Sequence, residues 1–338
     1  MMNKPNLNPP KATIVVVPRE RFSVSQRSLD MIYEKTDNPF ALIYVDGGSP
    51  RPTKRYLEKQ SQEKRFKLIR TEHYLTPNEA RNLGARQVET EFVVFIDNDV
   101  LVKEGWLEAL VNCAEETGAW VVGPLYLMGE IEQGIVHMAG GLAHVVVEDG
   151  KRRFYETQAY YGNNLEDVQP QLHREPCEMV EFHCVLVRNS TFPIVGKFDE
   201  NLKSALENPD FCMLVRHAGG SIYFEPAAIV SYLPPYAHPM NWSDLRYFIL
   251  RWSYLWNYAN LEPFRKKWKI PENDPSLIRQ FSEWERWRTE AVIGSVNQFR
   301  RIFGRRLGTF IHRKISKVER KVNKWVVRDR RRPPQNTP

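Results

Sequence analysis

The chain has 338 residues, of which 42% are hydrophobic and 26% are charged, and its formal net charge is +7 at pH 7. This composition excludes collagen-like, disulfide-dense and mainly disordered proteins and allows one large domain or two medium ones. The four cysteines show no zinc-ligand spacing, the polar N-terminus does not resemble a signal peptide, and no run reaches the roughly 18 apolar residues of a membrane span, so we expect a cytoplasmic protein with reduced thiols.

Short apolar runs alternate with helix-like segments through the first third of the chain. We expect strands at 12–17, 40–46, 65–70, 91–97 and 119–123, and helices at about 23–35, 52–63, 77–89 and 104–117, with Ser23 as an N-cap. This alternation predicts an α/β fold with a mainly parallel sheet flanked by helices, and ligands beyond the carboxyl ends of the strands. Residues 125–180 are irregular, 160–176 are expected to form an active-site loop, and further strands are predicted at 179–187 and 221–226.

Two carboxylates two residues apart, Asp97 and Asp99, end the predicted strand 91–97. Side chains two apart in an extended segment point the same way, so both can face one spot, where a cation would offset their repulsion. Mg²⁺ or Mn²⁺, which also bind diphosphate oxygens, would suit them. The alternative is a capped strand end or a solvated acidic turn. Neither GxGxxG nor a P-loop motif is present.

The second predicted strand ends at Asp46, which Gly47 and Gly48 follow. Glycines allow a ring or phosphate to approach the backbone, and a carboxylate can accept hydrogen bonds from a base or ribose, although a simple turn has the same pattern. Arg81 and Arg86, on the helix before the acidic pair, could neutralise diphosphate or lie on the surface.

Several motifs in order resemble glycosyltransferase family 2, the inverting enzymes of the GT-A fold, over roughly residues 12–232. They are IVVVPRE (14–20), YVDGGS (44–49), NEARNLGAR (78–86), FIDNDVLVKEGWLEAL (95–110), VGKFDENL (195–202) and LENPDFCMLVRHAGGSIYFEP (206–226). The resemblance implies a GT-A nucleotide-diphospho-sugar transferase fold and transfer of sugar from a nucleotide-sugar, with UDP the commonest carrier, to a glycan or lipid-linked acceptor.

The resemblance also implies roles for individual residues. Asp99 would bind the metal, Mn or Mg, directly. Asp97 would contact both the ribose and the metal sphere. The donor-binding residues would be Pro18, Glu20, Asp46, Arg81, Asp97 and Asn98.

Two positions depart from the family pattern. Asn208 stands where the family commonly has an aspartate general base, so that role would pass to Glu207 or Asp210, although a carboxylate at a helix N-terminus is also favoured by the helix dipole. Tyr232 stands where many relatives have a metal-binding histidine. His238 is near enough in sequence to replace it, although a lone histidine is more often a packing or surface residue.

The C-terminal third differs in composition from the rest. Seven of the nine tryptophans follow Asn241, and fourteen Lys and Arg against two acidic residues lie in 300–332. We therefore divide the chain into a disordered N-terminus (1–11), a GT-A catalytic domain (12–240), an aromatic-rich helical extension (241–298) and a basic helical or disordered tail (299–338).

The basic tail mixes its charges with apolar residues over 299–327. This pattern is typical of a helix on an anionic membrane surface, such as the inner face of the plasma membrane, or of a solvated helix. Nucleic-acid binding is not expected, because no recognised module is present.

Two other functions remain open. A sugar nucleotidyltransferase would need a glycine-rich loop after the first strand, where this chain has Pro18, Arg19, Glu20 and Arg21. A lapsed enzyme, acting as a nucleotide-sugar-binding or scaffolding protein, would explain Asn208 and Tyr232 but not the intact pair of Asp97 and Asp99.

Overall fold

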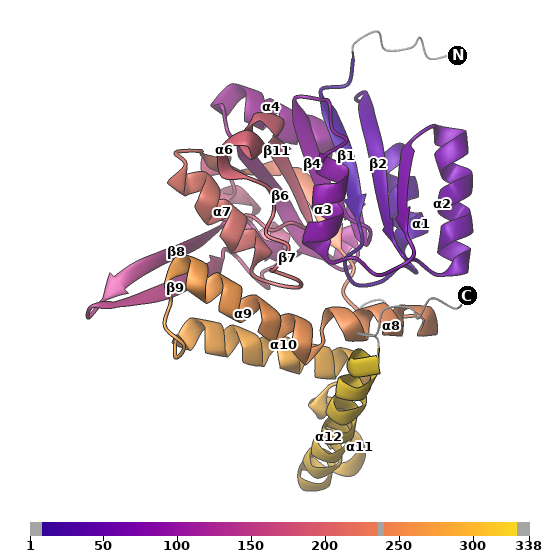
Figure 1. Cartoon of the computed structure of the whole chain (residues 1–338), viewed down its shortest axis with the longest axis vertical. Helices are drawn as coiled ribbons and strands as arrows, with labels where there is room; N and C mark the ends of the chain where they lie inside the picture. The colour runs from indigo at the N-terminus through magenta and orange to yellow at the C-terminus, as the bar shows by residue number, and fades with distance from the viewer. Residues whose placement is uncertain (1–8, 236–239, 330–338) are drawn as a thin grey trace, which may run out of the picture.

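The computed structural model describes residues 9–235 and 240–329 of the chain. Its centre is a ten-stranded sheet in the order β10-β12-β6-β11-β4-β1-β2-β3, with β5 paired to β12 and β7 paired to β6 (Figure 1). Helices cover both faces of the sheet. The predicted α/β fold is confirmed.

The N-terminal half is a parallel α/β unit. Its strands are β1 (Ala12–Val17), β2 (Phe40–Gly47), β3 (Lys67–Thr71) and β4 (Phe92–Asp97), and its connecting helices are α1 (Ser25–Glu34), α2 (Arg51–Lys64) and α3 (Pro77–Ala85). Every residue of β1 and β4 is buried, and apart from Thr13 and Asp97 all of them are apolar, as expected for strands covered on both faces. Ser23 is not the N-cap of α1, because that helix begins two residues later and Val24 holds the cap position.

The other half makes the sheet mixed rather than mainly parallel. β11 (Cys184–Arg188) lies antiparallel between β4 and β6 (Val121–Met128), whereas β6 and β12 (Ile222–Tyr232) are parallel. The remaining strands of this sheet are β5 (Val100–Val102), β7 (Ile135–Met138) and β10 (Glu175–Pro176), and the helices beside this half are α4 (Trp106–Thr117) and α7 (Glu207–His217).

The segment expected to be irregular has regular structure. β7 follows β6, and β8 (Gly141–Glu148) and β9 (Lys151–Gln158) form a separate antiparallel hairpin. The expected loop at 160–176 contains the short helices α5 (Leu165–Val168) and η2 (Gln169–Gln171) before β10. The other short helices are η1 (Ile131–Gln133), η3 (Asn189–Thr191) and α6 (Phe192–Val195).

Five helices follow the sheet. They are α8 (Trp242–Arg251), α9 (Tyr254–Trp268), α10 (Pro275–Ile293), α11 (Val296–Phe303) and α12 (Arg305–Asp329). Figure 1 shows α8, α9 and α10 below the sheet, with α11 and α12 projecting from them. Among the described residues, no helix has the length and apolar character needed to cross a membrane.

Candidate active site

Asp97, the last residue of β4, and the next two residues, Asn98 and Asp99, are buried. Asp97 pairs in register with Val17, so the ends of β1 and β4 lie side by side. Asn98 accepts a hydrogen bond from the Arg19 amide at 3.0 Å and donates to the Arg21 carbonyl and to Ser25 Oγ, each at 2.8 Å. Its side chain therefore ties the β1–α1 connection to the end of β4.

Asp97 is surrounded by cationic and imidazole groups. Arg81 Nη2 lies 3.4 Å from Oδ1, while His183 Nδ1 lies 3.0 Å and Arg19 Nε 3.6 Å from Oδ2. Burial lowers the pKa of Arg81, and Asp97 and Glu207 oppose that shift. Both oxygens of Asp97 thus have partners within the protein.

The carboxylate of Asp99, unlike that of Asp97, has an oxygen without a hydrogen-bond partner in the described part of the chain. Its Oδ1 is buried without a hydrogen-bond partner among the described residues, and Oε2 of Glu20 is in the same condition. Burial, followed by the charges of Asp97 and Glu20, raises the pKa of Asp99 well above its usual range. A carboxylate oxygen without a partner beside two further carboxylates is a suitable ligand for a hard dication, so these residues fit the implied metal.

The carboxylate of Asp46 is held by its own turn. It accepts hydrogen bonds from the Ser49 amide and Oγ, each at 2.9 Å, and it forms an ion pair with Arg70. Asp46 is therefore placed at the end of β2 as the sequence predicted, with its hydrogen-bonding capacity directed to Ser49 and Arg70.

Helix α8 covers the ends of β1 and β3. Its residues Asp244, Tyr247 and Arg251 lie on one face and are buried. The Tyr247 hydroxyl donates to the carbonyls of Pro18 at 3.3 Å and Leu75 at 3.0 Å. Asp244 Oδ1 accepts from the amide of Phe22 at 2.9 Å. Pro18, one of the predicted donor-binding residues, thus lies beneath this helix.

Glu207 is the first residue of α7 and is bound by three arginines. Its Oε1 lies 2.8 Å from Arg19 Nη1, 3.7 Å from Arg251 Nη2 and 3.9 Å from Arg81 Nη1. Burial alone would raise the pKa of Glu207, but the three arginines outweigh it and lower the pKa. Oε2 has no hydrogen-bond partner in the described part of the chain.

Asp210 lies one turn later in α7 and faces helix α9. Lys267 Nζ approaches Oδ2 at 2.7 Å, and the Trp268 indole donates to Oδ1 at 2.8 Å. Burial raises the pKa of Asp210, and Lys267 opposes that shift. The structure separates the two predicted base candidates, because Glu207 lines the cleft described next and Asp210 does not.

A cleft of about 700 Å³ lies between the sheet and α10. Arg19, Glu20, Glu207 and Asn208 line one part of it, and Tyr232 another. The other predicted donor residues, Pro18, Asp46, Arg81, Asp97 and Asn98, are not among the residues that line it. His238, the predicted third metal ligand, lies outside the described residues.

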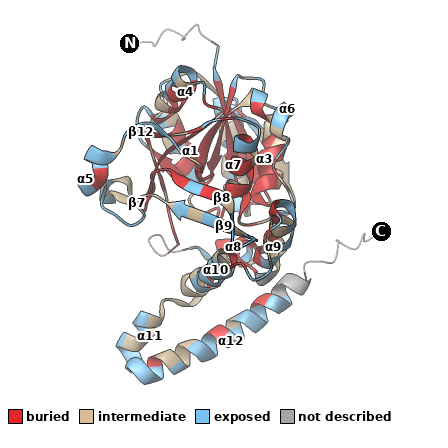
Figure 2. Cartoon of the chain, turned by 90° about the vertical axis from the view of Figure 1, so that its left-hand side faces the viewer, coloured by how far each residue is buried: buried red, intermediate tan, exposed pale blue. Residues whose placement is uncertain are grey.

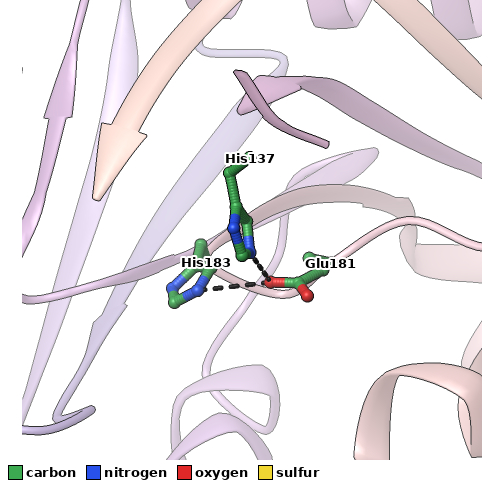
Figure 3. Close-up of side chains that lie close together, drawn as sticks. All are labelled: His137, Glu181 and His183. Atoms are coloured by element: carbon green, nitrogen blue, oxygen red, sulfur yellow. Dashed lines mark hydrogen bonds and ion pairs between the residues drawn. The ribbon is translucent and has the colours of Figure 1, made fainter. Parts of the chain in front are cut away.

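Three residues of this cleft were not predicted from the sequence. They are His137, Glu181 and His183, whose side chains converge in Figure 3. Oε2 of Glu181 lies 3.0 Å from His137 Nε2 and 3.2 Å from His183 Nε2. Tyr232, which replaces the expected histidine, stacks on the His183 ring with centroids 4.4 Å apart. The spacing of Glu181 and His183, two apart before a strand, was the available signal.

Comparisons with known proteins agree with this architecture. Residues 13–168 match the sequence profile described as "Glycosyl transferase family 2". A pre-mycofactocin glycosyltransferase of Mycobacterium tuberculosis is 27% identical over 168 residues, which are 49% of this chain and 32% of that protein. The chain thus spans about a third of that relative's length. A GalNAc(5)-diNAcBac-PP-undecaprenol beta-1,3-glucosyltransferase of Campylobacter jejuni is 28% identical over 116 residues, 34% of this chain and 38% of that protein.

Among solved structures, a mannosyltransferase from Pyrobaculum calidifontis in complex with GDP-Man and Mn²⁺ has a similar fold. Its TM-score is 0.51 at 12% identity, over 95% of this chain and 86% of that one. Residues 13–168 are therefore similar to glycosyl transferase family 2, and the sheet has the GT-A fold.

Proposed function

We propose that the chain is a glycosyltransferase that moves a sugar from a nucleoside diphosphate, UDP in the first instance, to a hydroxyl group of a glycan or lipid-linked acceptor, with inversion. The observation that carries this proposal is the buried group of Asp97, Asp99 and Glu20, where one oxygen of Asp99 has no partner. The similarity of residues 13–168 to glycosyl transferase family 2 and the lipid-linked acceptor named for the Campylobacter relative support it.

Mn²⁺ or Mg²⁺ would be held by Asp99 with Asp97 and would neutralise charge on the departing diphosphate. Arg19 lines the cleft beside these residues and supplies fixed positive charge for the same phosphates. Burial lowers the pKa of Arg19, but Asp97 and Glu207 outweigh it and raise the pKa, so Arg19 stays charged.

Glu207 is our candidate for the general base. The acceptor oxygen attacks the anomeric carbon as the bond to the diphosphate breaks, and the acceptor proton passes to Oε2 of Glu207, which has no other partner among the described residues. The lowered pKa keeps Glu207 ionised at neutral pH. Asp210 is the alternative base, although Lys267 and Trp268 occupy its oxygens.

Donor binding on Pro18, Asp46 and Arg81 requires α8 to move, because Tyr247 of that helix bonds the Pro18 and Leu75 carbonyls. We expect this displacement to accompany donor entry.

The test is turnover and binding of a panel of nucleotide-sugars with Mn²⁺ or Mg²⁺. We expect metal-dependent turnover of one donor, a loss of about 100-fold or more in Asp99→Asn, and a loss of about 100- to 10,000-fold in kcat for Glu207→Gln. Asp210→Asn is tested beside them, and Glu166→Gln, an exposed carboxylate of α5, is the matched control.

The other outcomes separate the alternatives. A larger loss in Asp210→Asn than in Glu207→Gln would assign the base to Asp210. Donor binding without turnover, with acceptors present, would favour a lapsed enzyme. Absence of metal-dependent donor binding would contradict the proposal.

We also propose that α11 and α12 bring the protein to an anionic membrane on the cytoplasmic side. The face of α12 that carries Ser316 and Asn323 is buried, and Glu319 on the same face pairs with Arg288 of α10 at 3.2 Å. Apolar side chains are therefore left exposed, namely Leu307, Phe310, Val318, Val322 and Trp325, among exposed lysines. An exposed apolar stripe flanked by cations complements an anionic lipid surface.

A further inference from the structure

We propose that His137, Glu181 and His183 form a second metal centre, which binds a transition-metal dication of the Zn²⁺ class. Metal binding at this centre does not depend on the sugar-transfer reaction. It would differ from the proposed site at Asp99 in its ligand atoms, its position and the metals that it prefers.

The distances among the three side chains suit a shared ion. One ligand atom from each residue can be chosen so that all three lie within 4.8 Å of one another. Two of these separations, from Glu181 Oε2 to the Nε2 atoms of the histidines, are 3.0 and 3.2 Å. In a tetrahedral Zn²⁺ site with bonds of about 2.0–2.1 Å, ligand atoms are about 3.3 Å apart. The two separations from Glu181 are already close to that value.

The hydrogen bonds of His183 point to the same conclusion. Its Nδ1 faces Asp97 Oδ2 at 3.0 Å, and its Nε2 faces Glu181 Oε2 at 3.2 Å. When Nδ1–H donates to Asp97, the lone pair of Nε2 faces a carboxylate oxygen, and a cation between the two atoms removes that repulsion. His137 Nε2 meets the same oxygen, so one ion would serve both rings.

The surroundings of the cluster match those of known metal ligands. Histidine ligands usually donate their second N–H to a carboxylate, which is the position of Asp97 relative to His183. Gln158 Nε2 donates to the other oxygen of Glu181 at 2.6 Å. Tyr232 stacks on the His183 ring and restricts its rotation. The orientations of Glu181 and His183 are thus fixed by neighbours that would not bind the metal.

The ligand types and the cleft determine the class of metal. Two imidazoles and one carboxylate suit Zn²⁺ or Co²⁺ better than Mg²⁺, which prefers oxygen ligands. All three residues line the cleft, so a fourth position remains for an oxygen of water, a hydroxyl group or a phosphate. The Asp99 site has only oxygen ligands, and metal preference therefore distinguishes the two.

A histidine–glutamate pair can also be purely structural, and the chain contains such a pair for comparison. His144 Nδ1 lies 2.5 Å from Glu178 Oε2, where it has no second histidine partner among the described residues. His144→Gln is therefore the matched control for His137→Gln and His183→Gln.

The experiment uses the full chain after chelator treatment and without nucleotide. The chain is titrated with Co²⁺ and with Zn²⁺, and binding is measured by calorimetry and by the visible absorption of Co²⁺. We expect one ion per chain and tetrahedral Co²⁺ bands. Affinity should fall about 100-fold or more in His137→Gln, His183→Gln and Glu181→Gln, and about 10- to 100-fold in Asp97→Asn. His144→Gln and Asp99→Asn should stay within about twofold of the wild type.

The proposal is overturned if the wild type binds neither ion, if His144→Gln weakens binding as much as His137→Gln, or if Asp99→Asn abolishes binding while His137→Gln keeps it. Electron paramagnetic resonance of the Cu²⁺-loaded wild type is a second test, and it does not depend on whether the variants fold. Coupling to two imidazole nitrogens supports the centre, and coupling to none contradicts it. A chain that binds Co²⁺ in this way without sugar transfer would refute the proposed function and leave this centre standing.

Discussion

Glu156 shows how the cleft controls the charge of one residue. It extends from β9 to the cleft, where Gln280 donates a hydrogen bond to its carboxylate. Burial raises the pKa of Glu156 to about 7, with Gln280 opposing and Glu181, Glu207 and Glu283 adding to the shift. Near neutral pH the Glu156 side chain therefore changes between a neutral acid and a carboxylate.

The shift predicts a pH-dependent stability. The unfolded chain releases the Glu156 proton near pH 4.5 and the folded chain only near pH 7, so its contribution to the free energy of unfolding falls as pH rises through that window. The side chain in the Glu156→Gln variant cannot titrate. The melting temperature of the variant minus that of the wild type should therefore rise between pH 4.5 and 7. Melting curves at pH 5, 6, 7 and 8 measure this, and a difference that is constant with pH would contradict it.

The sequence was informative for residues whose neighbours along the chain define their position. Asp46, Asp97 and Asp99 end apolar runs, so their place at the carboxyl edge of the sheet could be predicted. Other partners of these residues come from distant segments. Arg70 lies 24 residues from Asp46 and His183 lies 86 residues from Asp97, and the sequence did not reveal either contact. His137 lies 44 residues from Glu181 and is brought to it only by the pairing of β7 with β6.

At the scale of elements, α3 packs against β1 through Gly84. A Cβ atom at this position would lie 2.2 Å from Val15 Cγ1 and 3.4 Å from Val45 Cγ2. Both contacts are with the rigid side chains of buried strands, so the helix itself would have to shift. Close contact between this helix and the sheet keeps Arg81, one turn earlier, against Asp97.

We expect Gly84→Ala to lower the free energy of unfolding by about 1–3 kcal/mol, because overpacking outweighs the gain of about 1 kcal/mol in helix propensity. Chemical denaturation measures the change. Val15→Ala removes the methyl group that clashes, so the double variant should be more stable than the sum of the two single changes predicts. If the two changes in the free energy of unfolding simply add, the contact with Val15 is not the reason that Gly84→Ala destabilises the fold.

Elements with strong local patterns were predicted better than those held by distant contacts. β1 and β4 matched their apolar runs closely, and the strand expected at 40–46 is β2. The β8–β9 hairpin was missed because its exposed and buried residues alternate weakly, and its position depends on α7 and α10. The antiparallel insertion of β11 could not be predicted either, since the apolar run gives no direction of pairing.

At the scale of the whole molecule, α11 and α12 project from a compact body (Figure 2). Exposed positions extend along most of α12, whereas buried positions concentrate in the sheet and the helices against it. Trp325 is 68% exposed and Val318 61%, and with Val322 they form an exposed apolar stripe along α12.

We expect the full chain to bind vesicles that contain anionic phospholipid and to bind neutral vesicles weakly. Val318→Ser, Val322→Ser and Trp325→Ser combined should reduce binding about tenfold or more, and salt should weaken binding by screening the lysines. Vesicle co-sedimentation measures the effect, with Trp242→Ser on α8 as the control for an exposed tryptophan. Equal binding to neutral vesicles, or concentration-dependent dimerisation without vesicle binding, would contradict the membrane assignment.

If the exposed apolar stripe of α12 holds the protein on a membrane as proposed, it has a kinetic consequence. A protein resting on a bilayer by this helix searches for a lipid-linked acceptor in two dimensions. Its rate then follows the number of acceptors per unit area of lipid, and diluting them with inert lipid slows transfer even when their concentration per volume is unchanged.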